Sequence, residues 1–184
     1  VTGDHDTRNG VLFPRRIDGH FALLERPNTS LVEGGPTSGS GVRLLVSDDL
    51  LTWTDTGPVF GGHPHYWDEL VGSGPPPIET EAGWLHIYHG VATHFQSANI
   101  YQAGALLLDR NDPTRVLGRT GDNILEPRMA WEISGQVPNV VFPAGLTVTG
   151  NPKIAGPDAV LNLYYGAADT VIGQATTTVG ELLA

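Results

Sequence analysis

Short apolar runs rich in β-branched and aromatic residues recur along the chain, each bounded by Gly, Pro or Asp. The clearest two are residues 21–24 and 42–46. Runs of this length between turn-forming residues are typical of β-strands. No stretch of 12 residues repeats its apolar positions with a helical period, and Val179–Leu183 could form at most one helical turn. The pattern therefore predicts an all-β protein.

The apolar runs belong to three similar units. Their openings are Asn9-Gly10-Val11-Leu12-Phe13-Pro14, Gly72-Ser73-Gly74-Pro75-Pro76-Pro77-Ile78 and Asn139-Val140-Val141-Phe142-Pro143. Two predicted strands follow each opening, at residues 21–26 and 42–47, 84–89 and 104–108, and 160–166 and 171–176. A unit of ~60 residues with three or four strands is typical of a propeller blade with long loops. The alternative is a β-sandwich whose segments are similar by accident, although the three units agree in order as well as in composition.

The predicted blades cover residues 8–60, 70–127 and 136–184, within one propeller portion of residues 1–184. A blade packs against a neighbour on both sides, so three blades alone would leave two apolar faces uncovered. We therefore expect the chain to belong to a larger ring or to form a homo-oligomer.

Composition and charge exclude several classes of function. With 24 Gly and 14 Pro in 184 residues, the chain favours strands joined by turns over a helical bundle. The net charge is −10, and no basic run is longer than Arg15 and Arg16, which argues against nucleic-acid and polybasic membrane-surface binding. No apolar run approaches the ~20 residues of a membrane span. Without cysteine there is no disulfide framework or thiolate metal site, and a cytoplasmic location is expected.

Seven motifs in a fixed order relate the chain to a known family. They are Arg8-Asn9-Gly10-Val11-Leu12-Phe13-Pro14, Ser47-Asp48-Asp49-Leu50-Leu51-Thr52-Trp53, Gly74-Pro75-Pro76-Pro77-Ile78, Gly83-Trp84-Leu85-His86-Ile87-Tyr88-His89-Gly90-Val91, Tyr101-Gln102-Ala103-Gly104-Ala105-Leu106-Leu107-Leu108-Asp109, Val137-Pro138-Asn139-Val140-Val141-Phe142-Pro143 and Tyr164-Tyr165-Gly166-Ala167-Ala168-Asp169-Thr170. Through them the chain resembles the C-terminal three blades of glycoside hydrolase family 130, the β-mannoside phosphorylases and related β-mannosidases. The resemblance implies a partial five-bladed β-propeller of about three four-stranded antiparallel sheets. At the observed spacing a full ring would have ~325 residues, of which ~140 lie outside this chain.

The resemblance implies that Arg8, Arg26, His89 and Tyr101 hold inorganic phosphate. Such a set suits an oxyanion, because the planar fork of arginine fits two oxygens and a protonated imidazole and a phenol add further donors. Taken singly, a strand arginine is usually solvated or ion-paired, and a histidine in this context can be a core residue. The four together favour an anion site within an acidic chain.

Sugar contacts are expected from four further residues. The resemblance places Asn9 and Asp169 near sugar hydroxyls, with a turn asparagine and an Asx cap at Thr170 as the respective alternatives. Trp67 lies in a predicted loop, where its ring could stack on a pyranose face. We assign the adjacent Asp68 to the same sugar-binding set.

No metal site is predicted. His63 and His65 flank Pro64, but two histidines without a third ligand nearby are more typical of a solvated loop. Asp48 and Asp49 belong to a blade-turn signature and are expected to satisfy turn amides rather than to act in catalysis.

The resemblance also implies a reaction in which phosphate attacks the anomeric carbon with inversion while an acid protonates the leaving oxygen. The family's acid is the aspartate of an Asp-Pro-Arg motif on an earlier blade, which this chain lacks; the nearest string, Asp112-Pro113-Thr114, lies in another loop. Leu70 also replaces a cation that the family carries before the Gly-Pro-Pro segment. No catalytic residue is assigned.

These observations lead to one expected function with two alternatives. We expect the intact protein to be an inverting β-mannoside phosphorylase that uses inorganic phosphate as co-substrate, needs no cofactor, and acts on an oligosaccharide or other glycan. The chain alone is expected to be inactive. The alternatives are a hydrolytic β-mannosidase of the same fold, which needs a carboxylate base, and an inactive glycan-binding or structural fragment.

Overall fold

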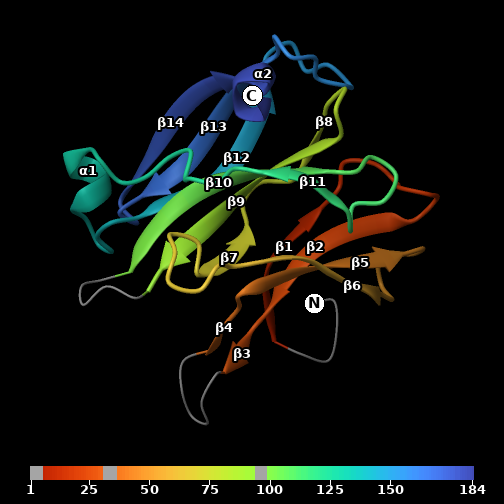
Figure 1. Ribbon diagram of the computed structural model, residues 1–184, viewed down its shortest axis with the longest axis horizontal. Helices are drawn as coiled ribbons and strands as arrows, with labels where there is room; N and C mark the ends of the chain where they lie inside the picture. Colours follow the sequence, from red (N-terminus) through yellow and green to blue (C-terminus); the bar gives the residue numbers. More distant parts are fainter. Residues whose placement is uncertain (1–5, 31–36, 94–98) are drawn as a thin grey trace.

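The computed structural model describes residues 6–30, 37–93 and 99–184, and these residues form three main antiparallel sheets (Figure 1). The first sheet has the order β1-β2-β5-β6. Its strands are β1 (Thr7–Leu12), β2 (Phe21–Pro27), β5 (Gly41–Ser47) and β6 (Thr54–Gly61), and a short ribbon of β3 (Thr29–Ser30) and β4 (Thr37–Ser38) extends from it. The strands expected at residues 21–26 and 42–47 are thus β2 and β5.

The second and third sheets follow in chain order. The second has the order β11-β10-β9-β7, with β8 pairing beside β7 on β9. Its strands are β7 (Leu70–Ser73), β8 (Ile78–Glu79), β9 (Trp84–Ala92), β10 (Ile100–Leu108) and β11 (Val116–Arg119). The third contains β12 (Val141–Val148), β13 (Val160–Ala167) and β14 (Val171–Thr178).

The third sheet has three strands in the described part of the chain, not the expected four. After β14 the chain turns directly into the short helix α2 (Val179–Leu183). A capping box starts this helix, because the Thr178 hydroxyl accepts from the Glu181 amide at 3.2 Å and the Glu181 carboxylate accepts from the Thr178 amide at 2.9 Å. The single helical turn expected here is confirmed. Neither α2 nor α1 (Ala130–Ile133), the helices of the described residues, is long and apolar enough to cross a membrane.

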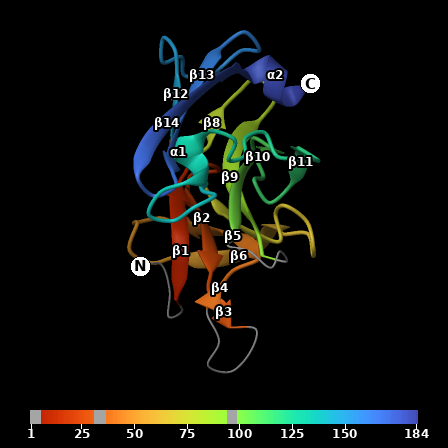
Figure 2. The same ribbon diagram turned by 90° about the vertical axis from the view of Figure 1, so that its left-hand side faces the viewer.

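The three sheets are arranged like blades. In Figures 1 and 2 they follow one another from the red and orange first sheet, through the yellow and green second, to the blue third. β7 contacts β1 and β2, and β12 contacts β9 and β10, so the first strand of each later sheet packs against the sheet before it. This arrangement confirms the predicted all-β fold and the partial propeller.

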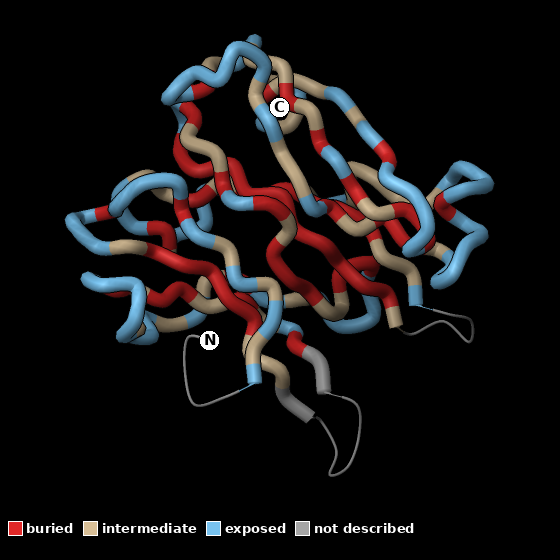
Figure 3. Tube along the Cα trace, turned by 180° about the vertical axis from the view of Figure 1, so that it is seen from behind, coloured by how far each residue is buried: buried red, intermediate tan, exposed pale blue. Residues whose placement is uncertain are grey.

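β9 is the centre of the core, and all of its residues are buried. Successive side chains of a strand point to opposite faces. Trp84 and Tyr88 therefore pack with Leu24 between the first and second sheets, whereas Leu85 and Ile87 pack with Leu161 between the second and third. Figure 3 shows the buried positions concentrated along these central strands. Trp84, which is completely buried, is thus a core residue.

The turn after β5 is held by a carboxylate, as expected from the blade-turn signature. One oxygen of Asp49 accepts hydrogen bonds from the backbone amides of Leu51 and Thr52, both at 2.8 Å. These hydrogen bonds hold the pKa of the Asp49 carboxyl below its usual value. Asp49 thus has the structural role that the sequence predicted.

Candidate functional site

Two arginines face each other at the start of the first sheet. Arg8 of β1 and Arg26 of β2 are directly opposite partners in the strand ladder. The Arg26 side chain is only 7 % exposed, and its guanidinium donates to the backbone oxygen of Val71 at 3.5 Å and to Asn28 Oδ1 at 3.2 Å. Neither arginine forms an ion pair within residues 6–30, 37–93 and 99–184, and Nε of Arg26 has no hydrogen-bond partner there. Burial, and then the charge of Arg8, lower the pKa of Arg26.

A β-bulge between Arg8 and Val11 brings Asn9 to the same place. Asn9 has φ of 57°, a left-handed conformation that asparagine tolerates better than most residues. A methyl group built on Gly72 of β7 would lie 2.5 Å from Cε1 of His89 and 2.9 Å from Oδ1 of Asn9. Only glycine at position 72 therefore leaves room for both side chains.

His89 lies opposite Gly72 on β9 and is 1 % exposed. Its Nδ1 has no hydrogen-bond partner among the described residues. Burial, followed by the positive charge of Arg26, lowers the pKa of His89 to about 3. Desolvation disfavours the charged ring, so His89 is neutral at neutral pH when no anion is bound. The protonated imidazole expected beside phosphate stays a prediction.

Tyr101 and Phe142 complete the surroundings of His89. The Tyr101 ring of β10 stacks near the imidazole with centroids 6.3 Å apart, and the Phe142 ring of β12 lies at 4.6 Å. The backbone amide of Tyr101 donates to the oxygen of Asn139 at 3.0 Å and so ties the second sheet to the third. Arg26 interacts electrostatically with both His89 and Tyr101. The structure thus brings together the residues that we call the anion cluster: Arg8, Arg26, His89 and Tyr101.

Asp169 lies at the end of the third sheet that is nearest to the anion cluster. It is exposed, with φ of 49°, in the turn between β13 and β14. The neighbouring Ala168 amide donates to the oxygen of Val140, which forms a bridge with Tyr101. The turn is held by the Thr170 hydroxyl, which donates to the Ala168 oxygen at 2.9 Å. Asp169 makes no hydrogen bond with the part of the chain that the structure describes, so the alternative of an Asx cap is not realised.

Trp67 and Asp68 are not placed as expected. Trp67 is 8 % exposed, its indole nitrogen donates to the Gly121 oxygen at 3.1 Å, and its ring stacks on Tyr88. Both the edge and the face of the ring are therefore occupied by the core, and no surface is left for stacking on a sugar. The sequence placed Trp67 in a loop correctly, but it could not show that β9 packs against that loop.

Asp68 is 1 % exposed and serves a buried network. Its carboxylate accepts from Arg119 at 2.5 Å and from the Tyr88 hydroxyl at 3.1 Å, and His63 Nδ1 lies 3.0 Å away. Both carboxylate oxygens of Asp68 are therefore occupied by neighbouring protein groups. Asp68 is thus a structural residue rather than a sugar ligand.

Four other residues were singled out in the sequence: Asp112, His63, His65 and Leu70. Asp112 accepts from the amide and hydroxyl of Thr114 within its own turn. No group of three or more His, Asp or Glu that could hold a metal ion occurs in the described residues, His63 and His65 included. Leu70 projects from the same face of β7 as Gly72, two residues on, and so lies beside the anion cluster without adding charge.

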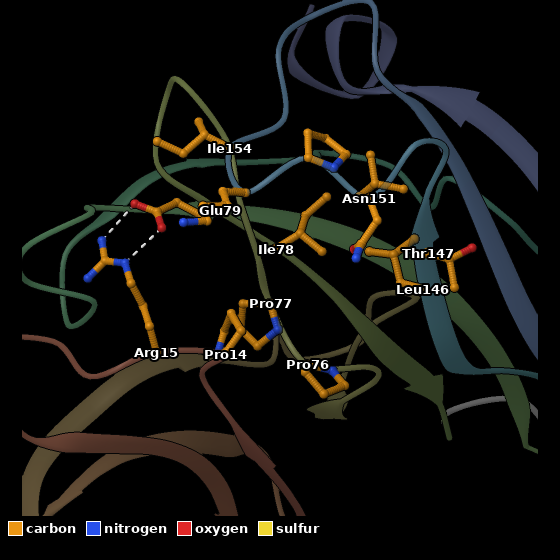
Figure 4. Close-up of a pocket in the computed structure, with 13 residues that line it drawn as sticks. Pro14, Arg15, Pro76, Pro77, Ile78, Glu79, Leu146, Thr147, Asn151 and Ile154 are labelled. Atoms are coloured by element: carbon orange, nitrogen blue, oxygen red, sulfur yellow. Dashed lines mark hydrogen bonds and ion pairs between the residues drawn. The ribbon is translucent and has the colours of Figure 1, made fainter.

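A separate cleft of about 930 Å³ opens at the other end of the inner strands (Figure 4). Its walls come from the segments that follow β1 and β7 and from the end of β12. They include Pro14, Pro76, Pro77, Ile78 and Ile154. Arg15 on the rim forms two hydrogen bonds with Glu79, at 2.6 and 2.7 Å. This cleft is mainly apolar and does not include the anion cluster.

Sequence reasoning missed the contributions of Gly72 and Phe142. Both lie within repeated unit openings, so the repeat was the available signal. Their roles depend on contacts between sheets, which a repeat alone does not reveal.

Comparisons with known proteins support one family. The model of a family described as beta-1,4-mannooligosaccharide phosphorylase matches residues 3–184. The 1,2-beta-oligomannan phosphorylase of Thermoanaerobacter sp. (strain X514) is 38 % identical over 176 residues, which are 95 % of this chain and 52 % of that protein. The beta-1,4-mannooligosaccharide phosphorylase of Ruminococcus albus is 36 % identical over 179 residues, covering 96 % of this chain and 49 % of that protein.

A solved structure agrees with this relationship. The beta-1,2-mannobiose phosphorylase of Listeria innocua, in complex with beta-1,2-mannobiose, superposes with a TM-score of 0.81 and 36 % identity, over 97 % of this chain and 46 % of that chain. The chain spans about half the length of the relatives that it matches. Its blades are therefore part of a five-bladed propeller fold, and the chain belongs to glycoside hydrolase family 130.

Proposed function

We propose that the intact protein is an inverting β-mannoside phosphorylase, and that this chain supplies its phosphate site and part of its sugar pocket. The observation that carries the proposal is the pair Arg8 and Arg26, which face each other and form no ion pair within the described residues, although the charge of Asp6 acts on Arg26 from a distance. Two like charges in this position raise the free energy of the empty site, and a bound oxyanion would relieve that repulsion.

The donors in the cluster suit phosphate. Arg26 has an unpartnered Nε, Arg8 is exposed, and the Tyr101 phenol is a further donor. Phosphate arrives already ionised, so the site needs donors that position it rather than a strong base. In an inverting phosphorolysis, phosphate attacks the anomeric carbon and the leaving sugar oxygen takes a proton from a general acid. That acid is not assigned to this chain, which we expect to be inactive without the rest of the ring.

Asn9 and Asp169 are the proposed sugar contacts. Oδ1 of Asn9 lies close to His89 above Gly72, so its amide borders the phosphate position. The exposed carboxylate of Asp169 makes no hydrogen bond with the described residues and can accept from sugar hydroxyls. The mannosidic linkage and the length of the acceptor are left to experiment.

A hydrolase of the same fold is the second candidate. Another solved structure, from work on family 130 hydrolases that target beta-1,2 mannosidic linkages, superposes with a TM-score of 0.72 at 26 % identity. In addition, Leu70 stands where the resemblance implies a cation. A hydrolase needs a carboxylate base for water. The phosphorylase is favoured because the four residues expected to hold phosphate are all kept and lie together.

Phosphate dependence of turnover tests this function. The intact protein should cleave β-1,2- or β-1,4-mannobiose only when phosphate is present, and it should release α-mannose 1-phosphate. Arg26→Ala should abolish this phosphate-dependent cleavage. Arg43→Ala is the matched control, because Arg43 is a strand arginine of the same sheet that pairs with Asp55 instead. Release of free mannose at the same rate without phosphate would favour the hydrolase.

A further inference from the structure

His89 is enclosed by strands from two sheets. Gly72 of β7 lies opposite it in the ladder, Tyr101 of β10 flanks its ring, and Phe142 of β12 reaches it from the third sheet. The Phe142 and His89 rings are 4.6 Å apart with planes inclined by 33°. This contact crosses the interface between the second and third sheets and places an apolar ring beside the imidazole.

The charged groups around His89 are mainly positive. Arg26 faces it from β2, with Arg8 of β1 opposite Arg26. His86 precedes it on β9, and Tyr101 approaches from β10. The backbone of Ser73 on β7 is the one contact that favours the protonated ring. Asp6 offsets part of the charge of Arg26, and its carboxylate accepts a hydrogen bond from Asn28. No carboxylate of the described residues acts on the His89 ring itself, so burial and Arg26 disfavour an imidazolium when no anion is bound.

We propose that Phe142 is a positioning residue for His89: it keeps the imidazole of the empty site dry and uncharged, so that an oxyanion bound beside Arg26 takes up one proton on that imidazole. The inference rests on the anion site of the proposed function and adds the protonation change that accompanies binding. Sequence similarity to phosphorylases does not by itself require any such change.

The proton balance is simple. A neutral imidazole, a dianion and one proton from the solvent or buffer form an imidazolium–dianion pair, and no covalent bond between heavy atoms changes. A dianion within hydrogen-bond distance favours the charged ring, and the attraction is stronger in a site that excludes water. Protonation also makes Nδ1, which lacks a partner among the described residues, a second N–H donor.

Sulfate is a suitable probe for the proton that is taken up when the anion binds. It has the shape of phosphate but is a dianion throughout the neutral pH range, so a proton taken up on binding must go to the protein. We would titrate sulfate into the intact protein by calorimetry at about pH 6, in buffers of different ionisation enthalpy, which gives the number of protons bound. Uptake of about one proton per sulfate is expected. The ¹⁵N shifts of the histidine rings should show His89 changing from neutral to protonated.

Two variants test the assignment. His89→Asn should bind sulfate without this proton uptake. Phe142→Leu should lose most of the uptake at about pH 6, because a hydrated histidine with a pKa near 6.5 is already largely protonated there, and should regain it at about pH 8. Phe21→Leu is the matched control, since Phe21 lies on β2 and packs against Arg16. It should keep the wild-type uptake at both pH values.

The outcomes separate this inference from the function on which it rests. Sulfate and phosphate binding with no proton uptake, or with uptake that persists in His89→Asn, would overturn the inference and leave the phosphate site in place. If proton uptake on sulfate binding depends on pH in Phe142→Leu as it does in the wild type, Phe142 has no role in positioning His89. If neither anion binds to the intact protein, both the inference and the phosphate site are wrong.

Discussion

Arg8 and Arg26 are directly opposed across β1 and β2, and no carboxylate of the described residues pairs with either guanidinium. Opposed like charges destabilise a strand pair. The Arg26 side chain adds to this cost because it is largely buried. An anion bound between the two guanidinium groups would offset this cost, and that is the arrangement we propose for phosphate.

This arrangement predicts that stability and phosphate binding change in opposite directions at position 26. Arg26→Met should raise the free energy of unfolding by about 1 kcal/mol without phosphate, because it removes a buried, unpaired charge. The same variant should lose phosphate binding. Denaturant unfolding with and without phosphate measures both effects. Arg43→Met, which breaks an ion pair with Asp55, should give no gain in stability.

Acid should destabilise the protein through two buried histidines. Burial lowers the pKa of both His86 and His89 to about 3, against about 6.5 in an unfolded chain. Below about pH 6.5 the unfolded state therefore binds more protons, and stability falls as the pH drops towards 3. Each histidine should contribute a slope of about 1.4 kcal/mol per pH unit in this window.

His86 offers the clearer measurement because it is fully buried outside the anion cluster. His86→Leu should remove about one proton from the pH dependence of unfolding between pH 4 and 6. The exposed His20, which contacts Asp48, supplies the control His20→Gln. An unchanged slope in His86→Leu would contradict the prediction.

Gly72→Ala should damage the anion site more than the fold. The new methyl group would press on the His89 ring and on Asn9, so the imidazole must move. We expect a loss of about 1–3 kcal/mol in stability and a larger relative loss of phosphate affinity. Gly121→Ala is the control, because a methyl group there meets no atom within 4 Å. Normal phosphate affinity in Gly72→Ala would show that the placement of His89 does not matter.

Removal of the charge should affect stability at Asp68 and substrate binding at Asp169. Asp68→Asn leaves Arg119 without its buried partner and should cost about 3–5 kcal/mol in stability. Asp169→Asn should leave stability unchanged and raise the KM for the mannoside. Thermal unfolding and steady-state kinetics of the intact protein distinguish the two. A normal KM for Asp169→Asn would remove Asp169 from the sugar pocket.

The sequence predicted several strands correctly, both in the core and at the surface. The predicted segment at residues 84–89 lies within the fully buried β9, and that at 171–176 lies within the largely exposed β14. The resemblance also grouped Arg8, Arg26, His89 and Tyr101, which the fold brings together from four strands.

The errors concern contacts between distant segments. Trp67 and Asp68 lie in a polar stretch that is typical of a loop, yet Tyr88 and Arg119 bury them. The lowered pKa of His89 was also not predicted, because it depends on burial between sheets and on Arg26, which comes from another sheet. Burial and desolvation are properties of the assembled sheets, and a local pattern does not contain them.

Phosphate titration of the intact protein by calorimetry, with Arg26→Ala beside the wild type, tests the central claim most directly. The account predicts one phosphate bound per chain in the wild type, and at least a tenfold weaker affinity in Arg26→Ala, corresponding to about 1.4 kcal/mol or more. Equal affinity in the two proteins would mean that phosphate, if it binds at all, does so away from the anion cluster. That result would contradict the account.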